Sequence, residues 1–413
     1  MTRAQGFGVR LRAHNLKSAE ATVKRIQAVA LTVAVIALFA VETIARVQAR
    51  YTAKTMGDVV QLRDAKTDTV VSVLTAVSNA YEMVVKGENV LRVPFQSVDD
   101  MRARPGLNGI PLLAPFANRL DEQAFYANGR KYNFDMELGN VRGAIPIHGY
   151  LSGTNMWKLV EAKADASGAW VASKLDFYRN PQYMKQFPFA HTLTMAYRLS
   201  EGVLEVRTRI DNLSTEPMPV AIGFHPYFQL ADSLRNDWTL SVGAETHWLL
   251  AQTKIPTGET ESTERFFGGD PHAVPLSRFA SQDIDDVFSD LERDVQGRAS
   301  VSVKGVKQKL EVVLGPNFKA VLVYSTAPGG RAASVAGRAV AAPPPPVSQG
   351  PPLPLSAKDT SPAPPMRGFV AFEPMAGITD AMNMAHKGTY RELQSIAPGS
   401  FWQGSFWIKP SGY

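Results

Sequence analysis

Short segments in which hydrophobic and polar residues alternate recur through most of the chain from about residue 65 onward. They are rich in Val, Tyr, Phe and Thr, and Gly, Asn, Asp or Pro residues separate them. Alternation with a period of two is typical of a β-strand that buries one face, and the intervening turns favour antiparallel pairing. Because helical periodicity is almost absent, we predict an all-β fold, a large antiparallel β-sandwich. The clearest segments are 69–75, 80–85, 190–199, 203–210, 238–242, 310–314 and 319–324.

The first 49 residues differ from the rest in composition. Residues 1–25 contain six Lys or Arg residues and one acid, and an apolar run follows over 26–41. That run is shorter than the ~20 residues of a membrane-spanning helix. It suits the hydrophobic region of an export signal, with a small-residue cleavage site at 47–49. We interpret residues 1–49 as an export signal or an uncleaved membrane anchor. The protein is then exported, periplasmic or envelope-anchored, and it is cytoplasmic if the leader is not a functional signal.

Charge and cysteine content exclude several classes of function. Of the formal net charge of +6, the leader carries +5 (six basic residues minus one acid), so the remainder is nearly neutral and unsuited to nucleic-acid binding. The chain has no cysteine, which excludes disulfides, thiol catalysis and cysteine-ligated metals. No His-x-x-x-His spacing and no glycine-rich nucleotide motif occurs. We therefore expect neither a metal nor a cofactor. The sequence does not indicate an oligomeric state.

Residues 328–366 interrupt the alternating pattern. They contain 11 of the 28 prolines, mixed with Ala, Gly and Ser. Such a composition buries too little apolar surface to offset the entropy of ordering the chain. Because strand-like sequence resumes at Phe369, we interpret this segment as a disordered insertion within one domain that spans residues 65–413.

A carboxylate follows a short apolar run near the C-terminus. The run 369–372 predicts a buried strand that delivers Glu373 to its end, and we expect Pro374, which has no N–H, to stop the ladder. Four other motifs precede this strand in the chain. They are Asn118-Arg119, His148-Gly149, the segment 224–228 with His225 and Tyr227, and the segment 285–288 that begins with Asp285.

Each of these polar residues also has an ordinary structural interpretation. A glutamate at a strand end is often solvated, a histidine between aromatic residues is often a core residue, and a surface arginine often pairs with a nearby acid for little stability. An asparagine or a histidine beside a glycine is common in turns. Asp285 lies in the acidic run 283–286, which is typical of a solvated loop.

Taken in chain order, the motifs resemble those of the aldose 1-epimerase (galactose mutarotase) family, whose fold is the galactose mutarotase-like supersandwich. The resemblance covers about residues 65–413. It implies that Glu373 and His225 are the catalytic base and acid, and that the sugar is bound by Asn118, Arg119, His148, Asp285 and Tyr227. The chain departs from the family pattern at Phe224, Pro226 and Asp286, where Asn, a small residue and His are more common.

The chemistry of such an enzyme needs one base and one acid. Interconversion of sugar anomers removes the proton from the C1 hydroxyl, protonates the ring oxygen O5 and then recloses the ring on the other carbonyl face. A carboxylate and an imidazole supply both roles near neutral pH without a metal or a cofactor. Arginine, histidine and aspartate can hold the remaining hydroxyls. Phe116, Tyr227 and Phe288 are candidate platforms for the apolar faces of the sugar.

We therefore expect a mutarotase acting on a free aldose such as galactose or glucose. One alternative is a hexose-6-phosphate 1-epimerase, which needs further cations for the phosphate; Arg179, Lys185 and Arg265 cannot be placed from the sequence. A second is a non-catalytic carbohydrate-binding protein of the same fold, which needs neither Glu373 nor His225. A third is a polysaccharide lyase or hydrolase on a related sandwich; glycoside hydrolysis needs a second well-placed carboxylate, for which Asp285 is the only obvious candidate.

Overall fold

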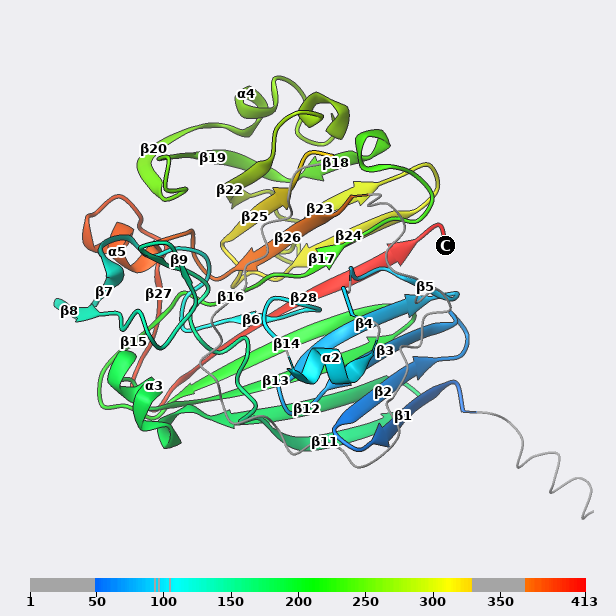
Figure 1. The fold of residues 1–413 in the computed structure, drawn as a ribbon, viewed down its shortest axis with the longest axis horizontal. Helices are drawn as coiled ribbons and strands as arrows, with labels where there is room; N and C mark the ends of the chain where they lie inside the picture. Colours follow the sequence, from blue (N-terminus) through cyan, green and yellow to red (C-terminus); the bar gives the residue numbers. More distant parts are fainter. Residues whose placement is uncertain (1–48, 93, 96, 104, 329–367) are drawn as a thin grey trace, which may run out of the picture. The chain divides into compact units, whose positions relative to one another are not determined.

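Antiparallel β-sheets make up most of the regular structure in the computed structural model (Figure 1). The model describes residues 49–92, 94–95, 97–103, 105–328 and 368–413. Residues 50–413 form one unit. Residues 1–48 of the leader and residues 329–367 of the proline-rich segment lie outside the described residues, so the predictions made for them remain predictions. Among the helices of the described part, none is long and apolar enough to cross a membrane.

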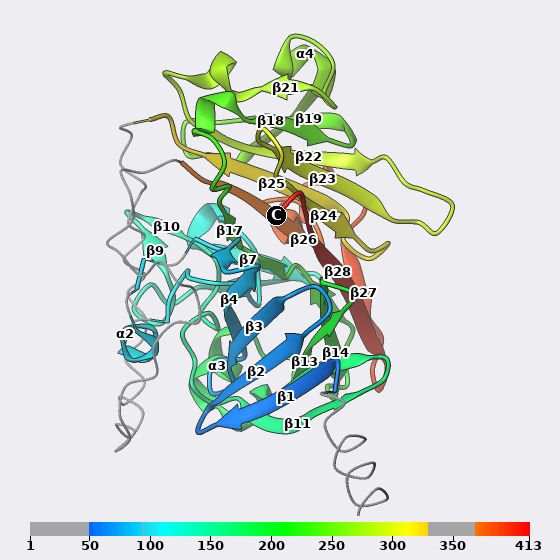
Figure 2. The ribbon, with the colours of Figure 1, turned by 90° about the vertical axis from the view of Figure 1, so that its right-hand side faces the viewer.

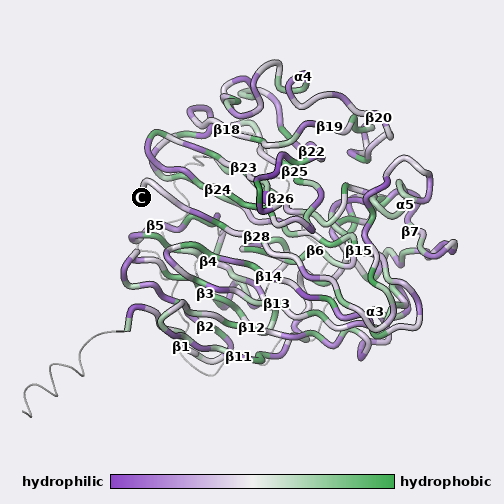
Figure 3. Tube along the Cα trace, turned by 180° about the vertical axis from the view of Figure 1, so that it is seen from behind, coloured by the Kyte–Doolittle hydropathy of each residue, from purple (hydrophilic) through white to green (hydrophobic). Residues whose placement is uncertain are grey.

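The largest sheet has nine strands in the order β11-β12-β13-β14-β28-β24-β23-β18-β21. Hydrophobic and hydrophilic residues alternate along them (Figure 3), and in β13 buried and half-buried residues alternate over most of the strand. The strands are β11 (Lys158–Asp165), β12 (Gly168–Asp176), β13 (His191–Ser200), β14 (Val203–Asn212), β28 (Phe401–Ser411), β24 (Lys309–Leu314), β23 (Ala299–Lys304), β18 (Thr239–Val242) and β21 (Val274–Pro275).

A second sheet has five strands in chain order and lies against β11 and β12. The strands are β1 (Tyr51–Met56), β2 (Val59–Asp64), β3 (Thr69–Leu74), β4 (Asn79–Val85) and β5 (Glu88–Asn89). The folded unit thus begins before residue 65, where the alternating pattern placed its start. Strand β1 escaped prediction because it is an edge strand in which only Tyr51 is buried, so its sequence needs little hydrophobic alternation.

The third sheet carries most of the residues of interest. Its strand order is β20-β19-β22-β25-β26-β16-β6, and β17 also pairs with β26. It packs on the nine-stranded sheet, where the rings of Phe224 and Phe406 lie 4.9 Å apart. Figure 2 shows β19 and β22 at the opposite end of the unit from the five-stranded sheet. The strands are β20 (Pro256–Ser262), β19 (Ala244–Leu250), β22 (Ile284–Leu291), β25 (Ala320–Ser325), β26 (Val370–Met375), β16 (Gly223–Phe224), β17 (Tyr227–Phe228) and β6 (Leu112–Leu113).

Short hairpins and helices complete the described structure. The two-stranded pairs are β7 (Ala124–Ala127) with β8 (Arg130–Asn133), β9 (Val141–Arg142) with β10 (Ile145–Pro146), and β15 (Met218–Val220) with β27 (Gln394–Ile396). The helices are α2 (Val98–Ala103), α3 (Pro181–Gln186), α4 (Thr263–Phe267) and α5 (Ala381–His386). The short 3-10 turns are η1 (Asp121–Gln123), η2 (Phe177–Arg179), η3 (Arg235–Asp237) and η4 (Leu276–Phe279). All seven segments predicted as strands are strands, which confirms the all-β antiparallel prediction.

Candidate active site

Strand β26 carries Glu373 and continues through Pro374. The prediction that this proline stops the ladder is therefore wrong for the ladder between β26 and β25. Pro374 lies opposite Val321 of β25, and that ladder continues to Met375. A proline removes only the hydrogen bond that its own N–H makes, and a strand with two neighbours has a second ladder that survives. Glu373 therefore lies inside a strand rather than at its end.

The other neighbour of β26 is one strand broken into two pieces, β16 and β17. The N–H of Ala376 donates to the carbonyl of Ile222 (2.8 Å). Hydrogen-bonded pairs in an antiparallel ladder recur at every second residue. The next two such pairs therefore involve Pro374 and Pro226, and neither proline has an N–H to donate. The two prolines explain why the ladder is interrupted there.

The interruption lies where His225 faces Glu373. Gly223 of β16 is opposite Met375 and Tyr227 of β17 is opposite Ala371, so the two pieces share one register. In that register His225 is opposite Glu373. Cross-strand partners project from the same face of a sheet with their Cβ atoms about 4.5–5.5 Å apart. Strand pairing therefore brings together an imidazole and a carboxylate that are far apart in the sequence.

The side chains of this pair are in contact. The Nε2 atom of His225 lies 2.9 Å from Oε1 of Glu373 and 3.3 Å from the hydroxyl of Tyr227. The ring of Tyr227 stacks on His225 with centroids 4.4 Å apart, and the ring of His148 meets His225 edge-on at 5.3 Å. Only 1% of Glu373 and 4% of His225 is exposed to solvent. The contact is thus shielded from bulk water.

Asn118, Arg119 and His148 come from two segments that cross beside the pair. The backbones of Arg119 and Ile147 form an isolated antiparallel β-bridge, and the backbone N–H of His148 donates to the carbonyl of Asn118 (2.7 Å). Asn118 and His148 both have a positive φ, of 55° and 60°. Gly149, also at φ 60°, lies so close to the facing segment that an added Cβ would be 2.0 Å from a backbone carbonyl oxygen. The crossing therefore needs glycine at this position.

Strand parity places Asp285 on the same face as Glu373 and His225. Asp285 is opposite Tyr324 of β25, which in turn is opposite Ala371 of β26. Its Oδ2 accepts a hydrogen bond of 3.0 Å from Nη2 of Arg119, whose Nη1 donates to Oδ1 of Asn118 (2.9 Å). The Arg119 side chain is 6% exposed and that of Asp285 is 16% exposed. Asp285 thus holds the guanidinium in place beside the cavity.

Asp286 projects from the opposite face, because successive residues of a strand alternate. Its Oδ1 lies 3.2 Å from Nε2 of His247. The other ring nitrogen of His247, Nδ1, lies 3.1 Å from Oε1 of Glu261. Burial raises the pKa of Asp286, but the hydrogen bond from His247 and nearby charges outweigh it, so the net pKa lies below the ordinary value. The residue that replaces the family's more common histidine is therefore a hydrogen-bond partner of His247 on the face away from the cavity.

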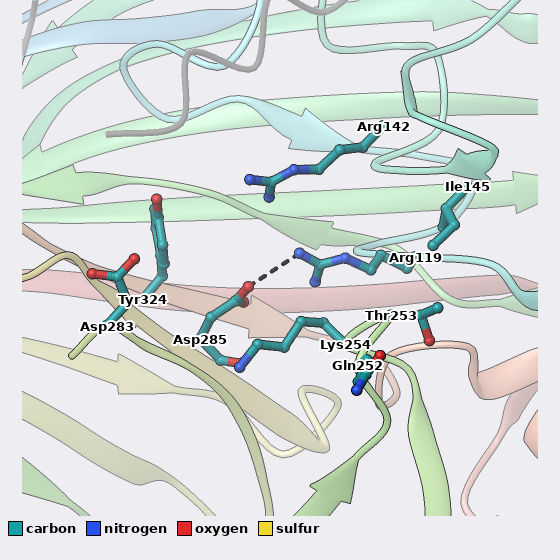
Figure 4. Close-up of a pocket in the computed structure, with 9 residues that line it drawn as sticks. All are labelled: Arg119, Arg142, Ile145, Gln252, Thr253, Lys254, Asp283, Asp285 and Tyr324. Carbon is teal, nitrogen blue, oxygen red and sulfur yellow. Dashed lines mark hydrogen bonds and ion pairs between the residues drawn. The ribbon is translucent and has the colours of Figure 1, made fainter. Parts of the chain in front are cut away.

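The polar residues line a small inner cavity that opens into a larger one. The inner cavity is lined by Asn118, Arg119, Arg142, Ile147, His148, His225, Tyr227, Asp285 and Tyr324. The outer cavity, of about 370 Å³, shares Arg119, Arg142, Asp285 and Tyr324 with it (Figure 4). In Figure 4 Arg142, Lys254, Asp283 and Tyr324 surround the Arg119–Asp285 ion pair. Glu373 lines neither cavity, and the cavity reaches it through His225.

A family model of aldose 1-epimerases matches residues 78–406 of the chain. The chain belongs to the aldose 1-epimerase family. A galactose mutarotase-like protein from Clostridium acetobutylicum is 19% identical, with 88% of this chain and 98% of that chain covered and a TM-score of 0.66. Galactose 1-epimerase from Lactobacillus acidophilus is 14% identical, with 88% and 98% covered and a TM-score of 0.63. At these identities the similarity shows the fold, the galactose mutarotase-like supersandwich that the motifs implied.

Protonation states follow from burial in this aldose 1-epimerase family member. Burial lowers the pKa of His148 well below its ordinary value, and the neighbouring His225 adds to the effect. Burial raises the pKa of Tyr227, and the charge of Glu373 raises it further. At neutral pH His148 is therefore uncharged, and Tyr227 keeps its proton and can donate it in a hydrogen bond.

Several buried atoms at this site have no hydrogen-bond partner among the described residues. They are Nδ1 of His148, Nδ1 of His225 and Oε2 of Glu373. A buried polar atom without a partner costs roughly 1–3 kcal/mol. Two of these atoms belong to residues that line the inner cavity, and the third belongs to the carboxylate directly behind His225, which fits a site built to receive the hydroxyl groups of a ligand.

The structure brings together all seven residues that the motifs singled out, since Glu373 contacts His225 and the other six line the inner cavity. Phe116 and Phe288 are wrong as sugar platforms, because both are buried in the main core. Arg142 and Tyr324 were missed. Arg142 carries no sequence signal, and Tyr324 reaches the site only through its register with Asp285. Arg179, Lys185 and Arg265 line none of the cavities described.

Proposed function

We propose that the protein interconverts the α and β anomers of a free aldose such as galactose or glucose. The observation that carries the proposal is the contact between His225 Nε2 and Glu373 Oε1 at the buried end of a polar cavity. Membership of the family supports an activity of the epimerase type on sugars. The chemistry requires a base and an acid at adjacent atoms of one ring, and this pair supplies both within one hydrogen-bond length.

In the proposed reaction Glu373 takes the proton of the C1 hydroxyl while His225 gives a proton to O5. The C1–O5 bond breaks and leaves an open-chain aldehyde, so the overall charge of sugar plus protein is unchanged. Rotation about C1–C2 presents the other face of the carbonyl, and the two proton transfers reverse as the ring closes. Arg119, His148 and Asp285 hold the remaining hydroxyls so that the ring returns to the same place.

Two features of the site bear on the alternatives. A carbohydrate-binding protein needs no buried imidazole–carboxylate contact, which is costly to bury and is retained here. Glycoside hydrolysis needs a second catalytic carboxylate, and the candidate Asp285 is already engaged by Arg119 at 3.0 Å. Both features favour the mutarotase.

Polarimetry of freshly dissolved α-galactose and α-glucose tests the proposal. We expect the wild type to accelerate the approach to anomeric equilibrium, and Glu373→Gln or His225→Asn to slow it by at least the ~10²-fold typical of losing a general acid or base. A matched control exists in the chain. His272 Nε2 lies 3.1 Å from Glu292 Oε2 in an exposed pair outside the cavities.

The corresponding control variants, His272→Asn and Glu292→Gln, should keep the wild-type rate. If the wild type is no faster than buffer on either sugar, the free-aldose proposal is wrong. If the variants of the catalytic pair and of the control pair are equally active, the activity is real but the assigned roles are wrong.

A further inference from the structure

The cavity wall contains a cation that the proposed reaction does not use. Arg142 lies at the end of β9 and lines both the inner and the outer cavity. Of the two carboxylates that line the outer cavity, Asp285 is already paired with Arg119 at 3.0 Å, and Oδ1 of Asp283 accepts the N–H of Ala327 at 2.8 Å. Within the described part of the chain, no ion pair or hydrogen bond engages the guanidinium of Arg142. Its N–H groups are therefore available to a ligand.

The side chain of Arg142 reaches toward the inner end of the cavity. Figure 4 shows it extended from the β9–β10 hairpin, with its guanidinium turned toward Tyr324. Burial is the main cause of the low pKa of His148, and the charge of Arg142 is among the further causes. Both observations place the guanidinium where it can act on a ligand that lies against His148 and His225.

The lining of the outer cavity has one positive charge more than it has negative charges. Its basic residues are Arg119, Arg142 and Lys254, and its acids are Asp283 and Asp285, so 3 − 2 = +1. The Nζ atom of Lys254 lies 3.5 Å from the backbone carbonyl oxygen of Asp285, and no ion pair engages it among the described residues. A concave site with a surplus cation and an open guanidinium attracts an anion and can bind it through charge-assisted hydrogen bonds.

The proposed reaction decides which carbon of the sugar lies nearest to Arg142. The inner cavity, of about 20 Å³, has room for about one water-sized group, so the ring itself occupies the outer cavity. The C1 hydroxyl and O5 then lie at the inner end, against Glu373 and His225. The ring oxygen O5 is bonded to C5, and C5 carries C6. A group on C6 therefore lies beside the inner end, whereas C3 and C4 lie on the far edge of the ring.

We propose that Arg142 binds a carboxylate at C6 of the reacting sugar, so that the preferred substrate is a hexuronic acid. This inference rests on the proposed mutarotase function and names its substrate class. The planar guanidinium donates two parallel N–H bonds to a carboxylate. A carboxylate carries one negative charge, which equals the surplus of the lining, whereas a phosphate monoester carries about −1.5 to −2 at pH 7 and exceeds it. The charge balance therefore favours the carboxylate.

NMR exchange spectroscopy at anomeric equilibrium, with each rate corrected for the rate in buffer, tests the proposal on four compounds. Glucuronate, its neutral amide glucuronamide, glucose and glucose 6-phosphate share one ring and differ only at C6. We expect kcat/KM for glucuronate to exceed that for glucuronamide and for glucose at least ~10-fold, which corresponds to about 1.4 kcal/mol. Added salt should reduce this preference, because it screens the charge of a partly exposed guanidinium.

Two variants of Arg142 locate the effect. Arg142→Gln removes the charge, and we expect it to lower the ratio of kcat/KM for glucuronate to that for glucuronamide at least ~10-fold. Arg142→Lys keeps the charge without the planar pair of donors and should lower the same ratio about threefold. Arg130→Gln is the matched control and should leave the ratio unchanged, because Arg130 is an exposed arginine on the β7–β8 hairpin and lines none of the cavities described.

The outcomes separate the two proposals. If glucose is turned over but glucuronate gains nothing over glucuronamide, the hexuronic acid proposal is wrong and the mutarotase stands. If glucose 6-phosphate is the best of the four substrates, the surplus cation receives a phosphate and the carboxylate is overturned. If glucuronate is preferred but Arg142→Gln keeps the preference, the role given to Arg142 is wrong. If no compound is turned over faster than in buffer, both proposals fall together.

Discussion

Replacing Asp380 by asparagine should stabilise the protein, and more so at high pH. Asp380 is 1% exposed and precedes helix α5 with φ 61°. Its Oδ1 accepts hydrogen bonds from the N–H of Asp121 (2.9 Å) and from Nδ2 of Asn383 (2.7 Å), while its buried Oδ2 has no partner among the described residues. Asparagine keeps the accepting oxygen and removes the charge.

The size of the effect follows from the pKa. Burial raises the pKa of Asp380 from its ordinary 3.8 to about 7, with the carboxylate of Asp121 adding to burial and Lys387 opposing it. Because the folded state holds the proton more tightly, stability falls as the pH rises between about 4 and 7. At about 1.4 kcal/mol per pKa unit, ionisation costs the native state at most about 4 kcal/mol above pH 7. The amide NH₂ of asparagine would have no hydrogen-bond partner, and this offsets about 1–3 kcal/mol of the stability gained by removing the charge.

Thermal unfolding at pH 5 and pH 8 measures the difference. For a folded unit of roughly 360 residues, an unfolding entropy of about 2.1 cal/mol/K per residue makes 1 kcal/mol worth roughly 1.3 °C. From pH 5 to pH 8 the advantage of Asp380→Asn should grow by about 2–3 kcal/mol, or about 3–4 °C. Asp68→Asn is the control, because Asp68 also has a positive φ (49°) but is exposed. Its effect should be the same at both pH values.

A particular result refutes this reasoning. If Asp380→Asn lowers Tm, and lowers it more at pH 8 than at pH 5, then the two donors stabilise an ionised Asp380. The buried carboxylate would then contribute to stability as an anion, and burial would not be the dominant influence on its pKa.

Three further predictions concern the cavity. Gly149→Ala should abolish soluble protein or lower Tm strongly, because its Cβ would lie 2.0 Å from a backbone carbonyl; an unchanged Tm contradicts the crossing described. Asp285→Asn should raise KM about tenfold with a smaller change in kcat, because Arg119 loses its charged partner. If kcat instead falls about tenfold while KM is unchanged, Asp285 has a chemical role. Tyr227→Phe should lower kcat less than ~10-fold in polarimetry, because its hydroxyl contacts His225 without being a proton donor or acceptor in the reaction; a 10²-fold loss makes it catalytic.

The polar motifs could be identified in the sequence, but the sequence did not predict that His225 and Glu373 lie in contact. The two segments that carry His225 and Glu373 are separated by most of the third sheet and by the proline-rich segment. Only the shared register of β16 and β17 on β26 places the two residues opposite each other. Register is a property of paired strands, and the alternation within either strand is compatible with more than one pairing.

Asp285 and Asp286 show the same limit more sharply. Both lie in one acidic run that is typical of a solvated loop, yet both belong to strand β22. Strand parity sends Asp285 to Arg119 in the cavity and Asp286 to His247 on the other face. The sequence predicts that neighbours in a strand face opposite ways, but it does not say which face holds the cavity.

By itself the sequence determined the fold class, since alternation with a period of two is a local property that each strand must satisfy to bury one face. It also determined the family and the seven candidate residues, because these rest on short motifs in a fixed order. Tertiary structure alone decided that Pro374 interrupts only one of two ladders and that Tyr324 and Arg142 join the cavity. These depend on contacts between segments distant in the chain, and no local pattern records such contacts.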